Sequence, residues 1–300
     1  DKDGIAHIAK NFSWPYGFPS HSNPGAPGVI LEGGELGYSL STSYGAVLDN
    51  PDLIAACLVG DGEAETGPTA TAWHLNKFIN PANDGAVLPI LHLNGYKISG
   101  PTIFGRMSNK ELKMLFRGYG YEPIIVEGLN IYKKMADALE KSYQMIKSIQ
   151  ERARSGQRVV APVFPMIVLK TLKGWTGIKK LHGEKMEGNC LSHQVVAPNA
   201  KSDREELKVL EQWLRSYNFS ELFSKESGFT DEINELIPED DYLRMGENKH
   251  AFPQRVRKDL VLPDVEQFVE DASVPGAEGS SSMRRIGLYL NAIFELNSDS

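Results

Sequence analysis

Two strand ends in this sequence carry the side chains best suited to chemistry. One apolar run stops at Gly60-Asp61-Gly62, and the next stops at Asn94-Gly95-Tyr96. The interval between them leaves room for one crossover helix and a return strand, and parallel strands joined in this way end at the same edge of a sheet. We therefore expect Asp61 and Asn94 to face one crevice at that edge, where α/β sheets bind ligands.

The oxygen donors at these two strand ends suit a magnesium ion that holds a diphosphate. Asp61 would supply a carboxylate oxygen, Asn94 its amide oxygen and Tyr96 its backbone carbonyl, and these are the hard ligands that Mg²⁺ prefers. Backbone N–H groups from Gly62 onward would point at the diphosphate, as at other helix N-termini. A turn cap is the alternative for Asp61 alone, and the matching amide on the next strand favours the metal site. The sequence contains neither the dinucleotide fingerprint nor the Gly-Lys-Ser/Thr of phosphate-loop NTPases.

Two later residues, Lys173 and His193, add a cation and a proton carrier. Each lies at or beyond the C-terminal end of a predicted strand. A Lys there can neutralise phosphate charge and a His can move protons near neutral pH, while a solvated Lys and a structural His are the alternatives. His21 is open to the same two interpretations. His92 lies inside a buried strand, so we expect it to be structural.

Composition narrows the class of protein. The 300 residues are 41% hydrophobic and 24% charged, which is typical of a globular chain with a sizeable core. The net charge of −7 disfavours nucleic acid or an acidic membrane as the main partner, and no stretch approaches membrane-spanning length. Cys57 and Cys190 are expected to be reduced thiols of a cytoplasmic protein. Because the chain opens on Asp1 without methionine, we expect it to be a fragment.

The order of patterns predicts an α/β fold with a doubly wound parallel sheet. Continuous apolar runs predict buried strands at 53–59, 87–93, 124–126 and 163–169. Helix signals, including a Ser108–Glu111 capping box, predict helices at 33–47, 66–81, 108–116, 132–153, 203–217 and 283–296. Strand and helix alternate to about residue 170, which is the pattern of a parallel sheet with helices on its faces.

Changes of composition predict three parts. Residues 1–200 form the α/β domain, without its N-terminal part. Residues 201–282, which contain acidic segments rich in Pro and Gly, read as an irregular interdomain connector. Residues 283–300 begin a further domain, because the apolar stripe of the helix at 283–296 has nothing obvious in this chain to cover it.

Several motifs in order carry a resemblance to a known family. Gly60-Asp61-Gly62 followed by Asn94 is similar to the diphosphate–magnesium motif of thiamine diphosphate enzymes. The wider text resembles phosphoketolase, on the motifs Gly33-Gly34-Glu35-Leu36-Gly37-Tyr38, Gly62-Glu63-Ala64-Glu65-Thr66-Gly67-Pro68, Leu91-His92-Leu93-Asn94-Gly95-Tyr96-Lys97-Ile98, Lys173-Gly174-Trp175-Thr176 and His193-Gln194-Val195. The resemblance is strong over residues 15–200 and implies a diphosphate-binding domain of the thiamine diphosphate type.

The resemblance implies the cleavage of a ketose phosphate, xylulose 5-phosphate or fructose 6-phosphate. Inorganic phosphate captures the two-carbon unit as acetyl phosphate, and an aldose phosphate and water are the other products. Thiamine diphosphate and Mg²⁺ are the implied cofactors. The implied metal ligands are Asp61, Asn94 and Tyr96, and the implied cofactor-binding residues are Gly34, Glu35, Leu36, Asp61, Gly62, Glu63, Asn94, Lys173 and His193. The implied catalytic residues are His193, Lys173 and His21, and Gln194 is the implied substrate contact.

The resemblance also implies a longer homodimeric enzyme. The missing N-terminal part should carry further substrate histidines, and the missing C-terminal part a pyrimidine-binding domain with the glutamate that activates the cofactor. The isolated chain is therefore expected to lack activity. A transketolase-like two-carbon transfer is the alternative within enzymes. A cofactor-binding or assembly module without chemistry is the alternative for the isolated chain.

Overall fold

The chain divides into two compact units, of which one contains the sheet. The structure is a computed structural model that describes residues 2–24, 28–31, 35–48, 50–224, 228–244, 246–247, 258–269, 279 and 281–298. One unit is Gly33–Leu236, and the other combines Asp1–Glu32 with Ile237–Ser300. The boundaries expected at residues 200 and 282 stay predictions.

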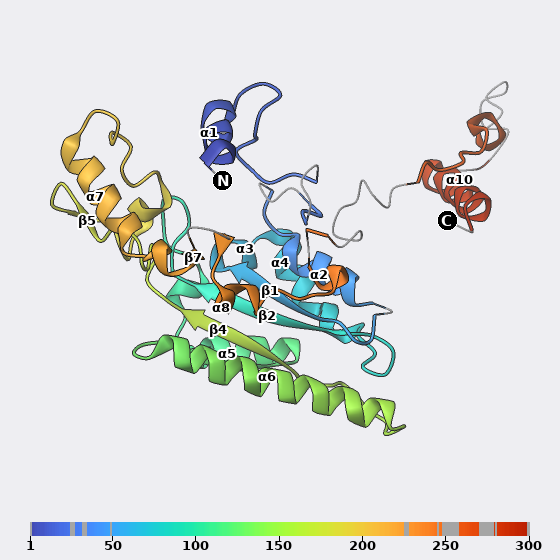
Figure 1. The fold of residues 1–300 in the computed structure, drawn as a ribbon. Coiled ribbons are helices and arrows are strands. Elements are labelled where there is room, and N and C mark those ends of the chain that lie inside the picture. Colours follow the sequence, from blue (N-terminus) through green and yellow to red (C-terminus); the bar gives the residue numbers. More distant parts are fainter. Residues whose placement is uncertain are drawn as a thin grey trace. The chain divides into compact units, whose positions relative to one another are not determined.

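The unit Gly33–Leu236 is built on a parallel four-stranded sheet in the order β1-β2-β4-β3 (Figure 1). The strands are β1 Ile54–Gly60, β2 Ala86–Leu93, β3 Tyr121–Val126 and β4 Phe164–Lys170. The helices before and between them are α2 Ser39–Val47, α3 Asp61–Ala64, α4 Gly67–Ala72, η1 Trp73–Lys77, η2 Phe104–Arg106, α5 Asn109–Tyr119 and α6 Ile131–Arg154.

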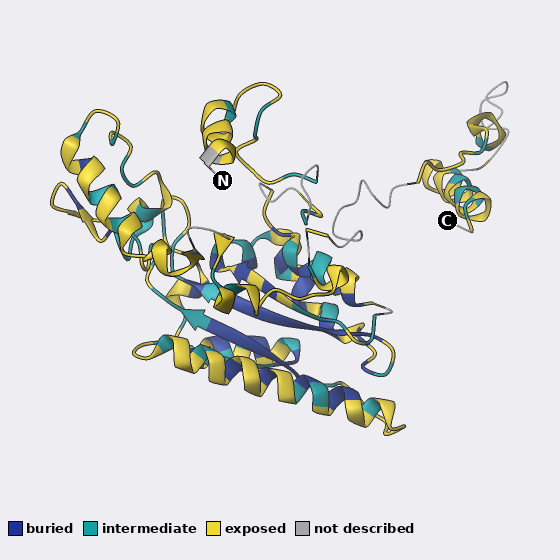
Figure 2. Cartoon of the chain, in the orientation of Figure 1, coloured by how far each residue is buried: buried dark blue, intermediate teal, exposed yellow. Residues whose placement is uncertain are grey.

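Helices lie on both faces of the sheet, which confirms the doubly wound α/β fold. Figure 1 shows α2, α3 and α4 on one side of the strands and α6 on the other. Strand β2 is buried along almost its whole length, as expected of a central parallel strand, and the strands are the dark core of Figure 2. In the edge strand β1 burial alternates, with Cys57 and Val59 buried and Leu58 66% exposed.

The register of the sheet sets the positions of the loops at its carboxyl edge. Gly60 pairs with His92 across β1 and β2, and His92 in turn pairs with Leu169 of β4. The residues that follow these three strands therefore leave the sheet at the same level. Asp61, Asn94 and the segment that begins at Thr171 are brought together in this way, as the sequence pattern predicts.

Aromatic side chains fix the helices that lead into this edge. Trp73, which is 1% exposed, packs edge-to-face on Phe116 of α5 and on Tyr121 of β3. The Tyr121 hydroxyl lies 2.6 Å from that of Tyr44 in α2, and burial raises the pKa of both phenols, so both stay protonated. The Trp73 indole N–H donates to the Ala64 carbonyl, which anchors α3 directly behind Asp61.

Some local predictions hold and others need correction. The capping box at Ser108 is present with both of its hydrogen bonds, and α5 runs past the expected end to Tyr119 before Gly120 caps it in a left-handed conformation. The helix expected at 66–81 stops being α-helical at Ala72 and continues as the short 3₁₀ turn η1. Thr66 precedes it, but its hydroxyl donates to the Gly62 carbonyl instead of capping the helix.

The segment after β4 leaves the sheet and docks on a helix. It forms a hairpin of β5 Lys180–Leu181 and β6 Glu184–Lys185, and then the turn η3 Cys190–His193. It is followed by α7 Arg204–Arg215, where the sequence predicts a helix. Shorter elements complete the unit: η4 Phe219–Glu221, β7 Phe223–Ser224, β8 Gly228–Phe229 and α8 Asp231–Asn234. Both cysteines, Cys57 and Cys190, are free.

The second unit contains α1 Lys2–Asn11, η5 Asp241–Leu243, η7 Val265–Phe268 and α10 Ser282–Leu296. Within it, Phe268 packs edge-to-face on Tyr289 of α10, and the Asn297 side chain exchanges two hydrogen bonds with the backbone of Val261. Most of the large apolar side chains of α10, including Met283, Ile286 and Leu290, are exposed. Among the described residues, no helix has the length and apolar character needed to cross a membrane.

Candidate functional site

Asp61 lies at the centre of the candidate site. It is the first residue of α3 and is 1% exposed. Its Oδ2 accepts the backbone N–H of Gly95 at 2.6 Å and the hydroxyl of Thr102 at 3.0 Å. Its Oδ1 accepts the N–H of the adjacent Gly62 at 3.1 Å. The carboxylate therefore ties the end of β1 to the loop that follows β2.

The loop 94–102 presents oxygen atoms next to this carboxylate. Asn94 Oδ1 accepts the N–H of Tyr96 at 3.0 Å, which forms a tight turn with Gly95 at a φ of 87°. The loop returns through a bridge between Tyr96 and Pro101, and the Thr102 N–H donates to the Gly95 carbonyl. Two of the three expected metal donors, Asn94 and Tyr96, thus belong to one compact turn that Asp61 anchors.

Two glutamates beside Asp61 hold neighbouring backbone segments. Glu63 Oε1 accepts the N–H groups of Gly37 and Ser39 and the Ser39 hydroxyl, so it caps the start of α2. Glu65 Oε2 accepts the N–H groups of Ile103 and Phe104, and its Oε1 pairs with Lys97. Glu63, which we expect to contact the cofactor, is therefore also the side chain that anchors the 35–39 loop.

Lys173 and His193 meet at the same edge of the sheet. Lys173 Nζ lies 3.2 Å from the Tyr96 carbonyl oxygen and 3.1 Å from His193 Nδ1. Because an ammonium group can only donate, Nδ1 accepts, and the neutral imidazole carries its proton on Nε2. His193 is exposed, so this second nitrogen is accessible.

His92 connects the two halves of the site. Its Nε2 lies 2.8 Å from the Thr171 hydroxyl, and the Thr171 N–H donates to the Leu93 carbonyl. Burial lowers the pKa of the imidazole, Asp61 opposes that shift and Lys173 adds to it. His92 therefore stays neutral and joins β2 to the start of the 171–193 segment, the structural role that the sequence predicts.

The remaining predicted residues lie as follows. Glu35 and Leu36 are exposed in the loop before α2, whose residue 37 is buried against Pro68. Gly34 lies outside the described residues. Gln194 is exposed directly after η3. His21 belongs to the other compact unit, where its Nδ1 lies 3.1 Å from the Ser20 hydroxyl.

Sequence reasoning did not identify Thr102 as part of this site. Thr102 is fully buried, donates to Asp61 and accepts the N–H of Gly105 at 3.0 Å. A Cβ at Gly105 would lie only 2.6 Å from the Gly95 Cα, so the backbone needs a glycine there to close this loop. The dipeptide Gly100-Pro101 indicates a turn, but nothing in the sequence indicates that the turn folds back onto Asp61.

The donor set fits a magnesium ion and an anionic ligand. Within the described residues, no ion pair joins Asp61 to a Lys or Arg side chain, although its carboxylate is buried. A buried charge without a counter-ion is costly, so the site favours a cation. The nearby oxygens of Asn94 and Tyr96 suit a hard divalent ion, and Lys173 suits the negative charge of a diphosphate.

A cavity of about 380 Å³ lies at the same end of the sheet, beside the start of the 171–193 segment. It is lined by Glu127, Gly128, Ile131, Lys170, Thr171, Leu172 and Trp175. Within the lining, Lys170 pairs with Glu127, and the Trp175 ring lies 5.6 Å from that of Tyr132.

The match to a family model decides the family. The model of the XFP N-terminal domain matches residues 1–256. The chain belongs to the XFP N-terminal domain family. This match and the relatives of the chain confirm the resemblance to phosphoketolase that the sequence motifs carry.

Relatives of this XFP N-terminal domain are named phosphoketolases. Probable phosphoketolase from Bradyrhizobium diazoefficiens is 50% identical over 301 residues, which are 99% of this chain and 38% of that protein. Probable phosphoketolase 2 from Rhizobium meliloti is 50% identical over 300 residues, with the same two shares. The chain thus spans little more than a third of the length of these relatives. A solved transketolase mutant from Pichia stipitis aligns with 76% of this chain and 29% of its own at 16% identity, and its TM-score of 0.38 is too low to bear on the fold.

Proposed function

We propose that the complete protein containing this XFP N-terminal domain is a phosphoketolase that depends on thiamine diphosphate and Mg²⁺. It would cleave xylulose 5-phosphate or fructose 6-phosphate with inorganic phosphate, to give acetyl phosphate, an aldose phosphate and water. Family membership and relatives named phosphoketolase support this proposal. The single observation in the structure that carries it is the meeting of Asp61, the 94–102 loop and Lys173 at one sheet edge.

In this proposal Asp61, Asn94 and the Tyr96 carbonyl hold the magnesium ion. The residues Gly34, Glu35, Leu36, Gly62 and Glu63 line the cofactor. When bound, thiamine diphosphate supplies the nucleophilic carbon and the electron sink for the cleavage of the carbon–carbon bond. The protein contributes binding, orientation and proton transfer.

In this proposal Lys173 neutralises negative charge in the site and His193 transfers protons. The Lys173 ammonium neutralises part of the diphosphate charge and donates to His193 Nδ1. The neutral ring of His193 therefore keeps its proton on the accessible Nε2, where it can be given to a reacting oxygen and recovered. His21 is a second proposed proton carrier at the reacting centre, and Gln194 a proposed substrate contact.

We further propose that the enzyme is a homodimer in the cytoplasm. The resemblance to phosphoketolase is what supports a second copy of the protein as the partner. Two free cysteines fit a reducing compartment.

An acetyl phosphate assay tests the proposal. The complete enzyme, loaded with thiamine diphosphate and Mg²⁺, should form acetyl phosphate from xylulose 5-phosphate and phosphate, measured as its hydroxamate. A protein that forms none, but moves a two-carbon unit to an aldose phosphate acceptor, would instead be a transketolase. The isolated chain should show no turnover in either assay.

A further inference from the structure

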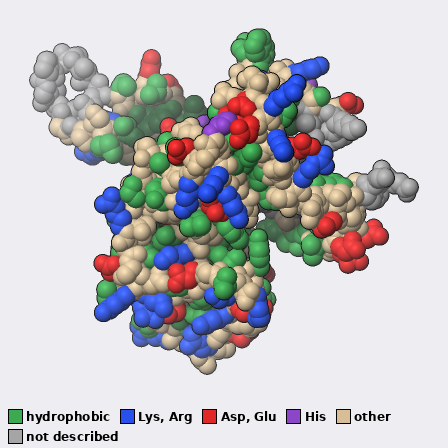
Figure 3. All heavy atoms as spheres, turned by 90° about the vertical axis from the view of Figure 1, so that its left-hand side faces the viewer, with side chains coloured by type: hydrophobic (Ala, Val, Ile, Leu, Met, Phe, Trp, Pro, Cys, Tyr) green, Lys and Arg blue, Asp and Glu red, His purple; other side chains and the backbone are tan. Residues whose placement is uncertain are grey.

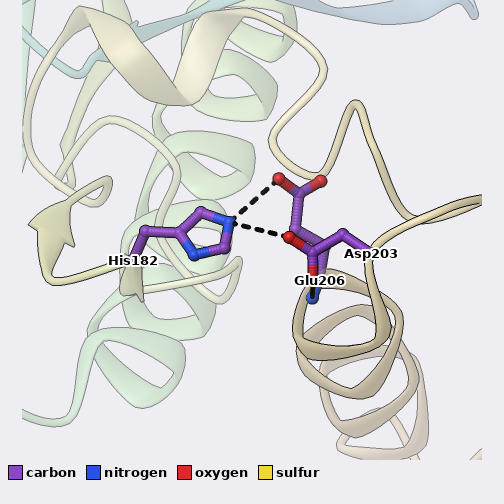
Figure 4. A group of neighbouring side chains, drawn as sticks. All are labelled: His182, Asp203 and Glu206. Atoms are coloured by element: carbon purple, nitrogen blue, oxygen red, sulfur yellow. Dashed lines mark hydrogen bonds and ion pairs between the residues drawn. The ribbon is translucent and has the colours of Figure 1, made fainter.

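A histidine outside the candidate site is surrounded by carboxylates. His182 forms the turn of the β5–β6 hairpin and faces the N-terminus of α7 (Figure 4). Its Nε2 lies 3.1 Å from Glu206 Oε1 and 3.5 Å from Asp203 Oδ2, and its Nδ1 lies 3.6 Å from Glu205 Oε2. Figure 3 turns the side on which β5 and α7 lie in Figure 1 toward the viewer and shows acidic and basic side chains mixed on that face.

Both ring nitrogens of His182 therefore face acceptors. A neutral imidazole has one N–H donor and one acceptor, so one nitrogen would meet a carboxylate without a proton between them. Only the imidazolium can donate to Glu206 through Nε2 and also present an N–H to the Glu205 carboxylate, which lies at ion-pair distance from Nδ1. The dipole of α7 opposes a cation at its N-terminus, but three carboxylates outweigh the partial charge of one helix end. Within the described residues, no Lys or Arg forms an ion pair with these carboxylates.

Two of the three carboxylates, those of Glu206 and Asp203, are held in place whether or not His182 is charged. Glu206 is 2% exposed, and its Oε2 accepts the Asn199 N–H at 2.6 Å. Asp203 Oδ1 accepts the N–H groups of Glu205 and Glu206 as the N-cap of α7. Hydrogen bonding to Glu206 raises the pKa of His182. Burial acts to raise the pKa of Glu206, but hydrogen bonds from Asn199 and His182 bring it below its ordinary value.

The hairpin that carries His182 continues into the Lys173–His193 pair. The Gly188 N–H donates to the Lys173 carbonyl at 2.7 Å, and Ser192 donates to the Asn189 carbonyl. Gly174, at a φ of 72°, leaves no room for a Cβ, which would lie 2.6 Å from the Ser192 Cβ. The loops before and after the hairpin are thus joined at several points.

A second attachment to α7 holds the same segment without a titrating group. The Trp213 indole N–H donates to the Thr176 carbonyl at 3.1 Å, and the Tyr217 hydroxyl lies 3.1 Å from that of Thr176. Thr176 has a φ of 69°, which is unfavourable for a β-branched residue and persists because these contacts hold it. The segment is therefore fastened to α7 at Thr176 and at His182.

We propose that His182 is a positioning residue, a proton-dependent clasp that holds the β5–β6 hairpin, and with it the Lys173–His193 pair, against the N-terminus of α7. The clasp is closed when the imidazole is protonated. Because its folded-state pKa is raised above 6.5, its contribution is complete below that value and is lost as pH rises through the folded-state pKa.

Hydrogen exchange of the complete protein at several pH values tests the clasp, with EDTA in every sample so that no metal ion contributes. Protection factors, which divide out the intrinsic pH dependence of exchange, are compared for residues 179–189. In the wild type they should fall about 2- to 5-fold from pH 5.5 to 8.5, the range of a partly exposed ion pair. Protection within α7 at 208–214 should stay constant.

Two variants separate the clasp from a general loss of structure. His182→Asn keeps the hairpin, because both turn residues have positive φ and Asn-Gly is the favoured pair for such a turn. This variant should show the low protection at every pH. Trp213→Phe removes the indole hydrogen bond of the other attachment, leaves the Tyr217 contact to Thr176, and should lower protection equally at all pH values while the pH dependence remains. Protection in the wild type that does not change with pH, or that changes equally in His182→Asn, would overturn the proposal.

A second readout, which rests on the proposed function, follows the cofactor. The affinity of the complete enzyme for thiamine diphosphate should weaken from pH 5.5 to 8.5 more in the wild type than in His182→Asn. If the affinity weakened equally in the wild type and in His182→Asn while hydrogen exchange behaved as predicted, the clasp would stand but its link to the Lys173–His193 pair would be refuted.

Discussion

The two halves of the candidate site are held in different ways. Asp61 and the 94–102 loop follow two paired strands, and the buried Asp61 carboxylate joins them by accepting from Gly95 and Thr102. Lys173 and His193 belong to a segment outside the sheet, whose only strands have two residues each. That segment is fastened to α7 by a few side-chain hydrogen bonds, from His182 to Glu206 and from Trp213 to the Thr176 carbonyl.

Because the two halves are held differently, substitutions in them should affect folding stability and ligand binding in different proportions. Strand register positions the first half, so a change there should disturb folding and ligand binding together. A few polar contacts position the second half, and local segments of this kind open without global unfolding. A change there should alter binding and local order while the free energy of unfolding stays nearly constant.

The largest effect is expected at Asp61. Asp61→Ala leaves the Gly95 N–H and the buried Thr102 hydroxyl without their acceptor, which should lower the free energy of unfolding by about 2–3 kcal/mol. Asp61→Asn keeps an acceptor there, so its stability should stay within about 1 kcal/mol of the wild type. Both should weaken Mg²⁺-dependent binding of thiamine diphosphate about 100-fold or more. Denaturant unfolding and calorimetric titration measure the two quantities.

A matched pair of substitutions at Thr102 serves as the control for this prediction. Thr102→Val removes the hydroxyl that donates to Asp61, and Thr102→Ser keeps it. The first should be less stable by about 1–2 kcal/mol than the second. If Asp61→Ala proved as stable as the wild type, the view that buried hydrogen bonds hold this half of the site would be wrong.

A smaller effect, confined to binding, is expected at Lys173. Lys173→Ala removes the ammonium beside Tyr96 and His193 and should weaken diphosphate binding about 10- to 100-fold. The free energy of unfolding should change by less than about 0.5 kcal/mol. Lys179→Ala, at an exposed lysine of the same segment, is the matched control and should leave both quantities unchanged. A large loss of stability in Lys173→Ala would contradict the comparison between the two halves.

The smallest effect is expected at His92, where the two halves meet. Burial lowers the pKa of His92 below 6.5, so the unfolded chain binds a proton that the folded chain excludes. Its contribution to stability is complete above pH 6.5 and declines as pH falls below that value. His92→Gln keeps a polar partner for Thr171 and should flatten the stability profile between pH 5 and 7, as measured by urea unfolding. If the free energy of unfolding changed with pH as steeply in His92→Gln as in the wild type, His92 would not be the group that causes this pH dependence.

Much of this arrangement could be predicted because it follows from local patterns. The apolar runs before Asp61 and Asn94 are parallel strands, although only β2 is buried along its length and β1, at the sheet edge, is buried in alternation. The capping box at Ser108 starts α5 where the sequence predicts. Such signals depend on neighbours in the sequence. The family resemblance also covered Lys173 and His193, which the structure brings together.

The contacts that could not be predicted depend on folding between distant segments. Thr102 reaches Asp61 because a loop turns back on itself, and His182 reaches Glu206 because a hairpin docks on a helix. Neither residue belongs to a motif whose spacing encodes its partner. Helix ends were also less predictable. The helix expected at 66–81 changes from α to 3₁₀ at Trp73, where this side chain packs on Phe116 and Tyr121.

The contacts of the indole rings give the 171–193 segment an intrinsic optical signal. Of the four tryptophans in the chain, Trp175 lies within this segment beside Tyr132, and Trp213 donates to its Thr176 carbonyl. Trp73 is buried far from solvent and provides a constant background. Release of the segment from α7 would therefore change the emission of two indoles at once, so stopped-flow fluorescence could time the ordering of this segment without an attached dye.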